Sequence, residues 1–584
     1  MKGAIQFLWP HLRRYRRAYA AGFGALAAKD IFGAAIPLAM RAAVDSLMAD
    51  RSLRLLFEFC GLLVGLSIAK GVFQYWMRVI LIGISRDIEF DLRNDLFAKL
   101  VTLDAGFYGR MRTGDILARA TNDMNAVRMM LGPGVMYWFE TSLTLVLSVS
   151  VMLWVDWPLT LVALIPAPFV SLAVLVFGRR IHDRFESIQT MFSDISSRVQ
   201  ENLSGVRVVR AYVQEQSELG HFETLNQAYI GENLRLAKIS GLFNPMLTTL
   251  VGFSFLLVLW FGGLRLAAHK ISLGGFVMFS TYMGMLVWPL IAMGWVANLM
   301  ERGRASLGRV RGLLEERPKI AAPKNPRAIP SPSLGKVSGE IEFLNVSVRY
   351  GERAALENVT MRIPAGMTVA IVGHTGSGKT TLAHLVPRLL DPSSGRVTLD
   401  GIDLREFSPE ELRRQIGYVP QETFLFSATL GQNIAFGVKD ASEGEIRRAA
   451  EIAGLAPDIG GFPEGLQTVV GERGITLSGG QKQRTAIARA VLRNPRILIL
   501  DDALASVDTA TEERILSELA SVMRGRTTIL ISHRVSTIRN ADRIFVIEHG
   551  ELVAEGSHAE LLERGGYYAD LYEKQLLEEE LEAI

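Results

Sequence analysis

Long apolar runs fall almost entirely within the first 300 residues of the 584-residue chain. A helix needs about 20 mostly apolar residues to cross the hydrocarbon core of a membrane. Six segments satisfy this length, near 18–44, 62–84, 135–155, 159–177, 246–264 and 276–296. The pattern therefore predicts an N-terminal bundle of six transmembrane helices. A tight turn is expected at Asp156-Trp157-Pro158, between the third and fourth segments.

Basic residues beside these segments predict their orientation, because such residues favour the cytosolic side of a membrane. They flank the expected cytosolic ends of the segments: Arg13, Arg14, Arg16, Arg17, Arg86, Arg179, Arg180, Arg235 and Lys238. Both termini are therefore predicted to be cytosolic. The two long cytosolic connections run to roughly 50 and 60 residues, which is long for structureless loops. We expect the spanning helices to continue into the cytosol and fold back as helical hairpins.

Two features inside the membrane segments leave alternatives open. Lys29 and Asp30 are costly in hydrocarbon, so they either face a cavity or a partner residue, or pair locally near the membrane interface. The sixth segment is rich in methionine and tryptophan: Met278, Met283, Met285, Trp288, Met293 and Trp295. These side chains either line a cavity for varied apolar molecules or face lipid and neighbouring helices.

After residue 300 the chain becomes charged and then proline-rich, which favours an extended linker. The first strand of a soluble domain is expected at 341–348. The sequence predicts a transmembrane domain over 1–305, a linker over 306–338, an α/β domain over 339–574 and an acidic tail over 575–584. The net charge of +3 gives no reason to expect nucleic acid as a partner, and the single cysteine, Cys60, excludes an intrachain disulfide.

A phosphate-binding loop follows the apolar stretch 368–372 and precedes a helix that opens with Thr381. Its residues form the pattern G-x-x-x-x-G-K-T: Gly373, His374, Thr375, Gly376, Ser377, Gly378, Lys379 and Thr380. Glycines let backbone N–H groups wrap phosphates, and the helix N-terminus adds partial positive charge. Lys379 is expected to reach the β- and γ-phosphates of ATP, and the Thr380 hydroxyl to hold Mg²⁺.

Two further elements strengthen the interpretation as an ATP site. The apolar strand 497–500 ends in Asp501, which is placed to hold Mg²⁺. Leu477-Ser478-Gly479-Gly480-Gln481 opens a helix about twenty residues earlier, where Ser478 can cap the helix and the glycines permit close approach of an anion.

The pentapeptide 477–481 resembles the signature motif of ATP-binding cassette (ABC) proteins, and other motifs follow in the order of that family. The resemblance implies that Tyr350 stacks on adenine, that Gln421 touches Mg²⁺ and the membrane part, and that His533 contacts the γ-phosphate. It implies nucleotide contacts for Ser478, Gly480 and Gln481. It also covers Gly471-Glu472-Arg473-Gly474, Ser506-Val507-Asp508 and, in the membrane half, segments such as 113–116 and 201–205.

By this resemblance the chain looks like a half-transporter of the multidrug- or lipid-exporter type. Its fold class would be a six-helix membrane bundle fused to a cytosolic α/β P-loop ATPase. Two cassettes would pack head to tail, each ATP lying between one phosphate loop and the other chain's signature. Coupling helices near 121–129 and 211–217 would carry the motion to the bundle. The function implied is ATP-driven export of hydrophobic or amphipathic molecules across a bacterial inner membrane. An importer of metal-chelating small molecules and a homodimeric lipid flippase remain alternatives.

One residue departs from the family pattern. ABC ATPases normally carry glutamate directly after the strand-ending aspartate, where it polarises the attacking water, whereas this chain has Asp502. The side chain is one methylene shorter, and a misplacement of about 1 Å can slow a reaction on the order of 100-fold. We therefore expect a slow site, completed in a heterodimer by a partner with glutamate at that position. A homodimer whose aspartates act through a longer water bridge is the alternative.

Overall fold

The computed structural model describes residues 2–49, 52–327, 338–471, 474, 477–507 and 509–582. The chain forms two compact units, and each is described by itself. The first unit comprises Met1–Val101 and Arg112–Glu316, and the second comprises Thr102–Met111 and Arg317–Ile584. The short segment 102–111 therefore belongs with the C-terminal part of the chain.

Helices of the first unit confirm the six expected spans. The helical stretches long and apolar enough to cross a membrane are Arg16–Ala49, Leu53–Thr102, Thr113–Val155, Trp157–Ser204, Glu215–Ala267 and Leu273–Glu315. Within them lie α2 (Arg16–Ala49), α3 (Leu53–Thr102), α7 (Val135–Val155), α8 (Trp157–Leu164), α9 (Ala167–Ser204), α11 (Glu215–Ala267) and α12 (Leu273–Glu315). Each apolar segment identified in the sequence falls inside one stretch. An additional helix, α1 (Lys2–Arg14), precedes them.

The expected turn at Asp156 is present and has two functions. Asp156 caps α8, its Oδ1 accepting a hydrogen bond from the Leu159 amide at 2.9 Å, and Pro158 occupies the first turn of the helix. Its Oδ2 lies 2.6 Å from Arg265 Nε on α11. A single buried carboxylate thus starts one helix and fixes it to another.

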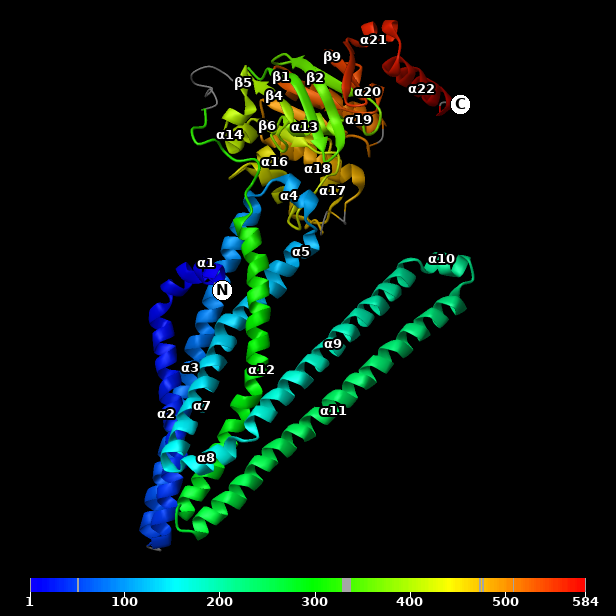
Figure 1. The fold of residues 1–584 in the computed structure, drawn as a ribbon. Helices are drawn as coiled ribbons and strands as arrows, with labels where there is room; N and C mark the ends of the chain where they lie inside the picture. Colours follow the sequence, from blue (N-terminus) through cyan, green and yellow to red (C-terminus); the bar gives the residue numbers. More distant parts are fainter. Residues whose placement is uncertain are drawn as a thin grey trace. The chain divides into compact units, whose positions relative to one another are not determined.

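The long connections are helical, as their composition predicts. In the second connection α9 and α11 continue side by side beyond the apolar segments and are joined by α10 (Val206–Ala211), which Figure 1 shows as one extended hairpin. In the first, α3 runs to Thr102, the chain reverses around α4 (Ala105–Arg110), and α5 (Thr113–Ala118) leads back toward α7. The coupling helix expected near 121–129 is therefore part of the stretch that enters the third span, and the short helix at the reversal is α4.

Two sheets build the core of the second unit. One is antiparallel, in the order β2-β1-β4-β5, and the other has the order β10-β9-β3-β8-β7-β6. Strands β9, β3, β8, β7 and β6 of the second sheet are parallel. The strands are β1 (Ile341–Tyr350), β2 (Arg353–Ile363), β3 (Thr368–Val372), β4 (Ser394–Leu399), β5 (Ile402–Asp403), β6 (Ile416–Val419), β7 (Ile497–Asp501), β8 (Thr527–Ile531), β9 (Arg543–Glu548) and β10 (Glu551–Gly556).

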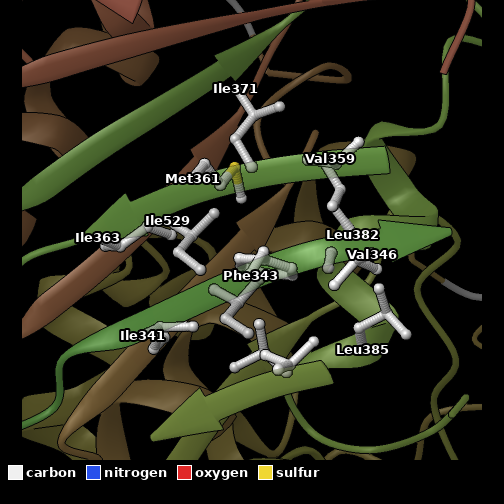
Figure 2. Packing of buried hydrophobic residues seen from close by; sticks show 14 of the residues in the cluster. Ile341, Phe343, Val346, Val359, Met361, Ile363, Ile371, Leu382, Leu385 and Ile529 are labelled. Atoms are coloured by element: carbon white, nitrogen blue, oxygen red, sulfur yellow. The ribbon is translucent and has the colours of Figure 1, made fainter. Parts of the chain in front are cut away.

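A continuous apolar cluster joins the two sheets. Figure 2 shows Phe343 and Val346 of β1 and Met361 of β2 directed toward Ile371 of β3 and Leu382 of α13 (Lys379–Leu385). All of these side chains are buried. Since α13 directly follows the phosphate loop, this packing fixes the loop to the sheets.

Helix boundaries differ from the expected domain limits at two places. Helix α12 continues to Glu315, into the region expected to be linker, and Leu307, Val310 and Leu313 are buried there. Helix α22 (Tyr567–Glu582) runs through most of the segment expected to be a separate acidic tail. Packing of an apolar face sustains the helix in α12, a contribution that local composition does not reveal. In the tail segment of α22, Leu576 and Leu577 are exposed, and Gln575 hydrogen-bonds to His533 and Val535. The first strand extends two residues beyond its expected end, to Tyr350. Pro330 and Pro332 lie outside the described residues.

Candidate ATP site

Neighbouring parallel strands bring the predicted residues to one edge of the six-stranded sheet. The phosphate loop follows β3, His533 lies just after β8, Asp501 ends β7, and Gln421 lies just after β6. These strands are adjacent in the order β3-β8-β7-β6. The carboxyl ends of parallel strands meet at the same edge of a sheet, where α/β proteins bind ligands. Residues more than a hundred positions apart in the sequence therefore converge.

A cavity of about 400 Å³ occupies this edge. The predicted residues that line it are Tyr350, Thr375, Gly376, Gly378, Lys379, Thr380, Thr381, Gln421, Asp501, Asp502 and His533. Gly373, His374 and Ser377 belong to the same loop without lining the cavity. Arg353, opposite Tyr350 in the β1–β2 pair, also lines it. No motif marks Arg353 in the sequence, although its proximity to Tyr350 across a short turn was a usable signal.

The phosphate loop depends on glycine at two positions with positive φ. Gly373 has φ 152°, and a Cβ there would lie 2.0 Å from the carbonyl oxygen of Ile547. Gly378 has φ 102°, and a Cβ there would lie 2.6 Å from the carbonyl oxygen of Ala355. Any side chain would clash with backbone atoms that cannot move aside cheaply. The loop therefore follows a path open only to glycine at these positions.

Lys379 is nearly buried, with 6% of its surface exposed, at the start of α13. Its Nζ donates hydrogen bonds to the carbonyl oxygens of Gly373 and His374, both at 2.8 Å. Burial lowers the pKa of Lys379, while the nearby Asp502 and Asp501 carboxylates act in the opposite direction. The ammonium is thus held inside the turn of the loop, at the cavity wall.

Asp501 is 1% exposed and faces Thr380. The Thr380 hydroxyl lies 3.3 Å from Asp501 Oδ1, whereas the buried Oδ2 has no hydrogen-bond partner in the described part of the chain. Burial is the main cause of the raised pKa of Asp501. An unsatisfied buried carboxylate oxygen is uncommon and indicates a site for a cation or a donor.

These residues fit ATP with Mg²⁺. Hydroxyl, carboxylate and amide oxygens of Thr380, Asp501 and Gln421 are the hard ligands that Mg²⁺ prefers. No group of three or more His, Cys, Asp and Glu that could hold a metal occurs among the described residues. A Mg²⁺ bound here would be held partly by phosphate oxygens and water, as is usual for nucleotide sites.

Asp502 lies next to Asp501 with a left-handed backbone. Its φ is 49°, and its amide donates a hydrogen bond to the carbonyl oxygen of Ile531 at 2.8 Å. Aspartate and asparagine enter this region more readily than most residues. The Asp502 side chain lines the cavity, and its backbone is fixed to β8. The distance that its carboxylate can reach into the cavity therefore depends on the length of the side chain.

The backbone of His533 is held by α22, a contact that no sequence motif predicts. Gln575 Nε2 donates to the carbonyl oxygen of His533 at 2.6 Å, and Gln575 Oε1 accepts from the Val535 amide at 2.8 Å. Burial and the nearby Lys379 lower the pKa of His533, which favours the neutral imidazole at neutral pH. The ring of Tyr567, also on α22, lies 4.3 Å from that of His374. No local motif identifies these contacts.

The signature residues lie apart from this cavity. Ser478 caps α18 (Gly479–Leu492): its Oγ accepts from the Gln481 amide at 3.3 Å, and Gln481 Oε1 accepts from the Ser478 amide at 3.0 Å. A Cβ at Gly480 would lie 3.0 Å from the carbonyl oxygen of Ser506. Ser478, Gly480 and Gln481 are absent from the described lining of the ATP cavity. Glu472, Arg473 and Asp508 lie outside the described residues.

Comparisons with known proteins identify both units. Residues 19–290 match the ABC transporter transmembrane region, and residues 356–505 match the ABC transporter ATPase domain. A probable multidrug resistance ABC transporter ATP-binding/permease protein of Bacillus subtilis, YheI, is 37% identical over 89% of this chain and 89% of its own length. An ATP-dependent lipid A-core flippase of Syntrophus aciditrophicus is 35% identical over 93% of this chain and 89% of its own length.

A solved structure supports the same conclusion. A bacterial Atm1-family ABC exporter with ATP bound has a TM-score of 0.81 and 29% identity, covering 96% of this chain and 99% of that one. The chain therefore belongs to the ABC transporter family and has the exporter fold. It is a multi-pass membrane protein whose ATPase domain couples ATP hydrolysis to transport. It carries a transmembrane region and an ATPase domain, the pair that makes up a half-transporter, and ABC half-transporters function as dimers.

Proposed function

We propose that this chain is one half of a heterodimeric exporter that moves hydrophobic or amphipathic molecules out across a bacterial cytoplasmic membrane. In this proposal 1–305 form the transmembrane domain and 339–574 the ATP-binding cassette. The observation that supports ATP as the energy source is the cavity at the carboxyl edge of the parallel sheet, lined by Lys379, Asp501 and His533. Relatives named for multidrug resistance and lipid A-core flipping support the substrate class.

The cavity residues that the sequence predicted have proposed roles. Tyr350 stacks on adenine, the amides of 373–381 wrap the phosphates, and Lys379 binds the β- and γ-phosphates. Thr380, Gln421 and Asp501 hold Mg²⁺, for which the buried Asp501 Oδ2 is available. Bound ATP with Mg²⁺ supplies the phosphoryl group that is transferred to water. Asp502 orients that water and accepts its proton, and His533 donates a hydrogen bond toward the γ-phosphate.

The signature of this chain is proposed to complete the partner's ATP site. Ser478 begins a 14-residue helix whose N-terminus favours an anion, yet it does not line this chain's described ATP cavity. A second cassette packed head to tail would place each signature over the other chain's phosphates. The same packing would close both cavities when ATP is bound and open them after hydrolysis, driving alternating access in the membrane units.

The substitution Ser478→Arg tests this arrangement. A bulky cation at the helix N-terminus opposes the helix dipole and should damage hydrolysis at the partner's site more than at this chain's own. Site-resolved hydrolysis in the assembled complex measures the difference. Ser517→Arg, on the separate helix α19 (Thr509–Met523), is the matched control. Loss confined to this chain's own phosphate site would contradict the head-to-tail arrangement.

The proposed heterodimer rests on Asp502. Its backbone is anchored to Ile531, so a side chain one methylene shorter than glutamate leaves the attacking water poorly placed. One slow and one fast site in a complex imply two different chains. Purification of this chain expressed alone provides the test. A stable dimer of this chain with vigorous, transport-coupled ATPase activity would contradict the heterodimer.

Transport in inside-out membrane vesicles tests the export direction. ATP-dependent accumulation of a fluorescent amphipathic dye inside the vesicles is expected with the wild type, and none with a Lys379→Ala variant. Accumulation in right-side-out vesicles instead, with ATP enclosed, would identify an importer.

A further inference from the structure

A further cavity lies inside the membrane unit. It has a volume of about 250 Å³ and is lined by residues of α2, α3, α7 and α12. Met285 and Trp288 of α12 form an apolar part of its wall, and four of the other lining residues are charged: Lys29, Asp30, Lys70 and Glu140. Ionisable groups at membrane depth are costly, and they normally mark a functional site.

Three charged side chains form a network at this cavity. Lys29 Nζ lies 2.8 Å from Asp30 Oδ1 and 2.6 Å from Glu140 Oε1. The Thr144 hydroxyl donates a further hydrogen bond to Asp30 Oδ1 at 3.1 Å. Lys29 and Asp30 thus pair with each other and also line a cavity, as the first of the two alternatives expected. One ammonium facing two carboxylates gives the network an excess of negative charge.

Two polar atoms of the cavity wall have no partner. Asp30 Oδ2 and Ser148 Oγ are buried and make no hydrogen bond within the described residues. Only 3% of the Asp30 side chain is exposed, and Ser148 is fully buried. Buried polar groups are normally satisfied, and an unpaired one is expensive in a low-dielectric interior. Both atoms can accept a hydrogen bond, so the cavity matches a ligand rich in donors.

Lys70 of α3 is the remaining charged residue on the wall. Its side chain lies over Gly33, where a Cβ would be 3.6 Å from Lys70 Cε and 3.9 Å from Nζ. Within the described part of the chain Lys70 makes no ion pair or hydrogen bond. Its charge offsets the excess negative charge of the network from a distance, and a bound cation would have to compete with it.

We propose that this cavity binds the protonated amine of an amphipathic molecule. The ammonium donates hydrogen bonds to Asp30 Oδ2 and Ser148 Oγ, and the adjoining apolar part packs against Met285 and Trp288. The Trp288 ring also attracts a cation through its π face. This inference rests on the proposed export function and narrows its substrates to amine-bearing amphipaths.

Binding to the purified complex in lipid nanodiscs provides the test. The probes are a dansyl-tagged long-chain alkylamine and its N-acetylated analogue, which has the same chain without the charge, with empty nanodiscs subtracted. The wild type is expected to bind the amine about tenfold more tightly than the acetamide, as one charge-assisted hydrogen bond would give. Asp30→Asn should abolish that preference, and Ser148→Ala should weaken it.

The variant Lys70→Met gives an opposite expectation. Removal of the competing ammonium should tighten amine binding severalfold and leave acetamide binding unchanged. Correct folding of the membrane unit in each variant is checked by its thermal unfolding in the nanodiscs, since the cassette is a separate compact unit. Equal amine preference in wild type, Asp30→Asn and Lys70→Met would overturn the proposal, and so would a wild type without amine preference.

Vesicle transport separates this inference from the proposed function. Amine binding that depends on Asp30, without ATP-driven accumulation of any amphipath, would refute export and support the cavity assignment. ATP-driven export of neutral amphipaths, without Asp30-dependent amine binding, would support export and refute the cavity assignment.

Discussion

The ATP cavity and the membrane cavity share one feature and differ in how they are built. Each contains an aspartate with a buried, unpartnered oxygen, Asp501 in the cassette and Asp30 in the membrane unit. The ATP cavity is formed by loops at strand ends, where Gly373 could not accept a Cβ without meeting a backbone oxygen at 2.0 Å. The membrane cavity is formed by side chains on helices, and a Cβ at its Gly284 would meet nothing within 4 Å.

This difference explains why the sequence reveals the ATP site as a set of motifs but reveals only Lys29 and Asp30 of the membrane cavity. A loop that binds phosphate through its main chain must keep glycines and a lysine at fixed spacing, so it leaves a contiguous motif. A cavity assembled by helix packing draws Lys29 and Glu140 from positions 111 residues apart, with no fixed spacing. The phosphate loop, which binds through its main chain, should consequently tolerate few substitutions. The membrane cavity, which binds through side chains, should tolerate substitutions that leave its charged residues in place.

The largest expected effect is at Lys379. Lys379→Ala removes the ammonium from the phosphate loop and should weaken ATP binding at this chain's site by about 100-fold, since hydrogen bonds to charged groups contribute about 1.5–3 kcal/mol each. Nucleotide titration of the purified complex measures it. Lys574→Ala is the matched control, because that lysine is 72% exposed on α22. Unchanged occupancy of the site would refute the assignment of Lys379.

A large effect of opposite sign is expected at Asp502. Asp502→Glu restores the missing methylene and should raise ATP turnover at this chain's site by about 10-fold or more, given the sensitivity of catalysis to misplacements of about 1 Å. Asp502→Asn keeps the shape, removes the base and should lower turnover further. Single-turnover hydrolysis resolves the two directions. A glutamate variant no faster than the wild type would show that the shorter side chain is not what limits this site.

Replacing one glycine of each site by alanine should change the stability of the complex by unequal amounts. Gly373→Ala forces a Cβ against the Ile547 carbonyl at φ 152° and should destabilise the cassette by about 2–4 kcal/mol. Gly284→Ala enters open space on α12, so its effect should stay within about 0.5 kcal/mol. Thermal unfolding of the complex followed by calorimetry compares them. Equal losses would contradict the distinction between the two sites.

The smallest expected effect concerns Gln575. Gln575→Ala removes both hydrogen bonds that hold the segment from His533 to Val535, and should lower kcat about threefold with KM nearly unchanged. Gln575→Glu keeps an acceptor for the Val535 amide but loses the donor to His533, so its kcat should be intermediate. Site-resolved ATPase kinetics of the assembled complex separate kcat from KM at this chain's own site, because the faster partner site would dominate the total rate. A rise in KM alone would show that Gln575 does not position the histidine.

The amino-acid sequence by itself determined the six spans, the strand before the phosphate loop and the order of cassette motifs. Each depends on local periodicity or short-range spacing, which apolar length and backbone geometry impose directly. Tertiary structure alone decided that α12 continues to Glu315, that Gln575 supports His533, and that Lys29 and Asp30 share a cavity with Ser148. These contacts join distant positions through helix packing, and packing energy depends on the whole surface that two elements bury, which no local pattern encodes.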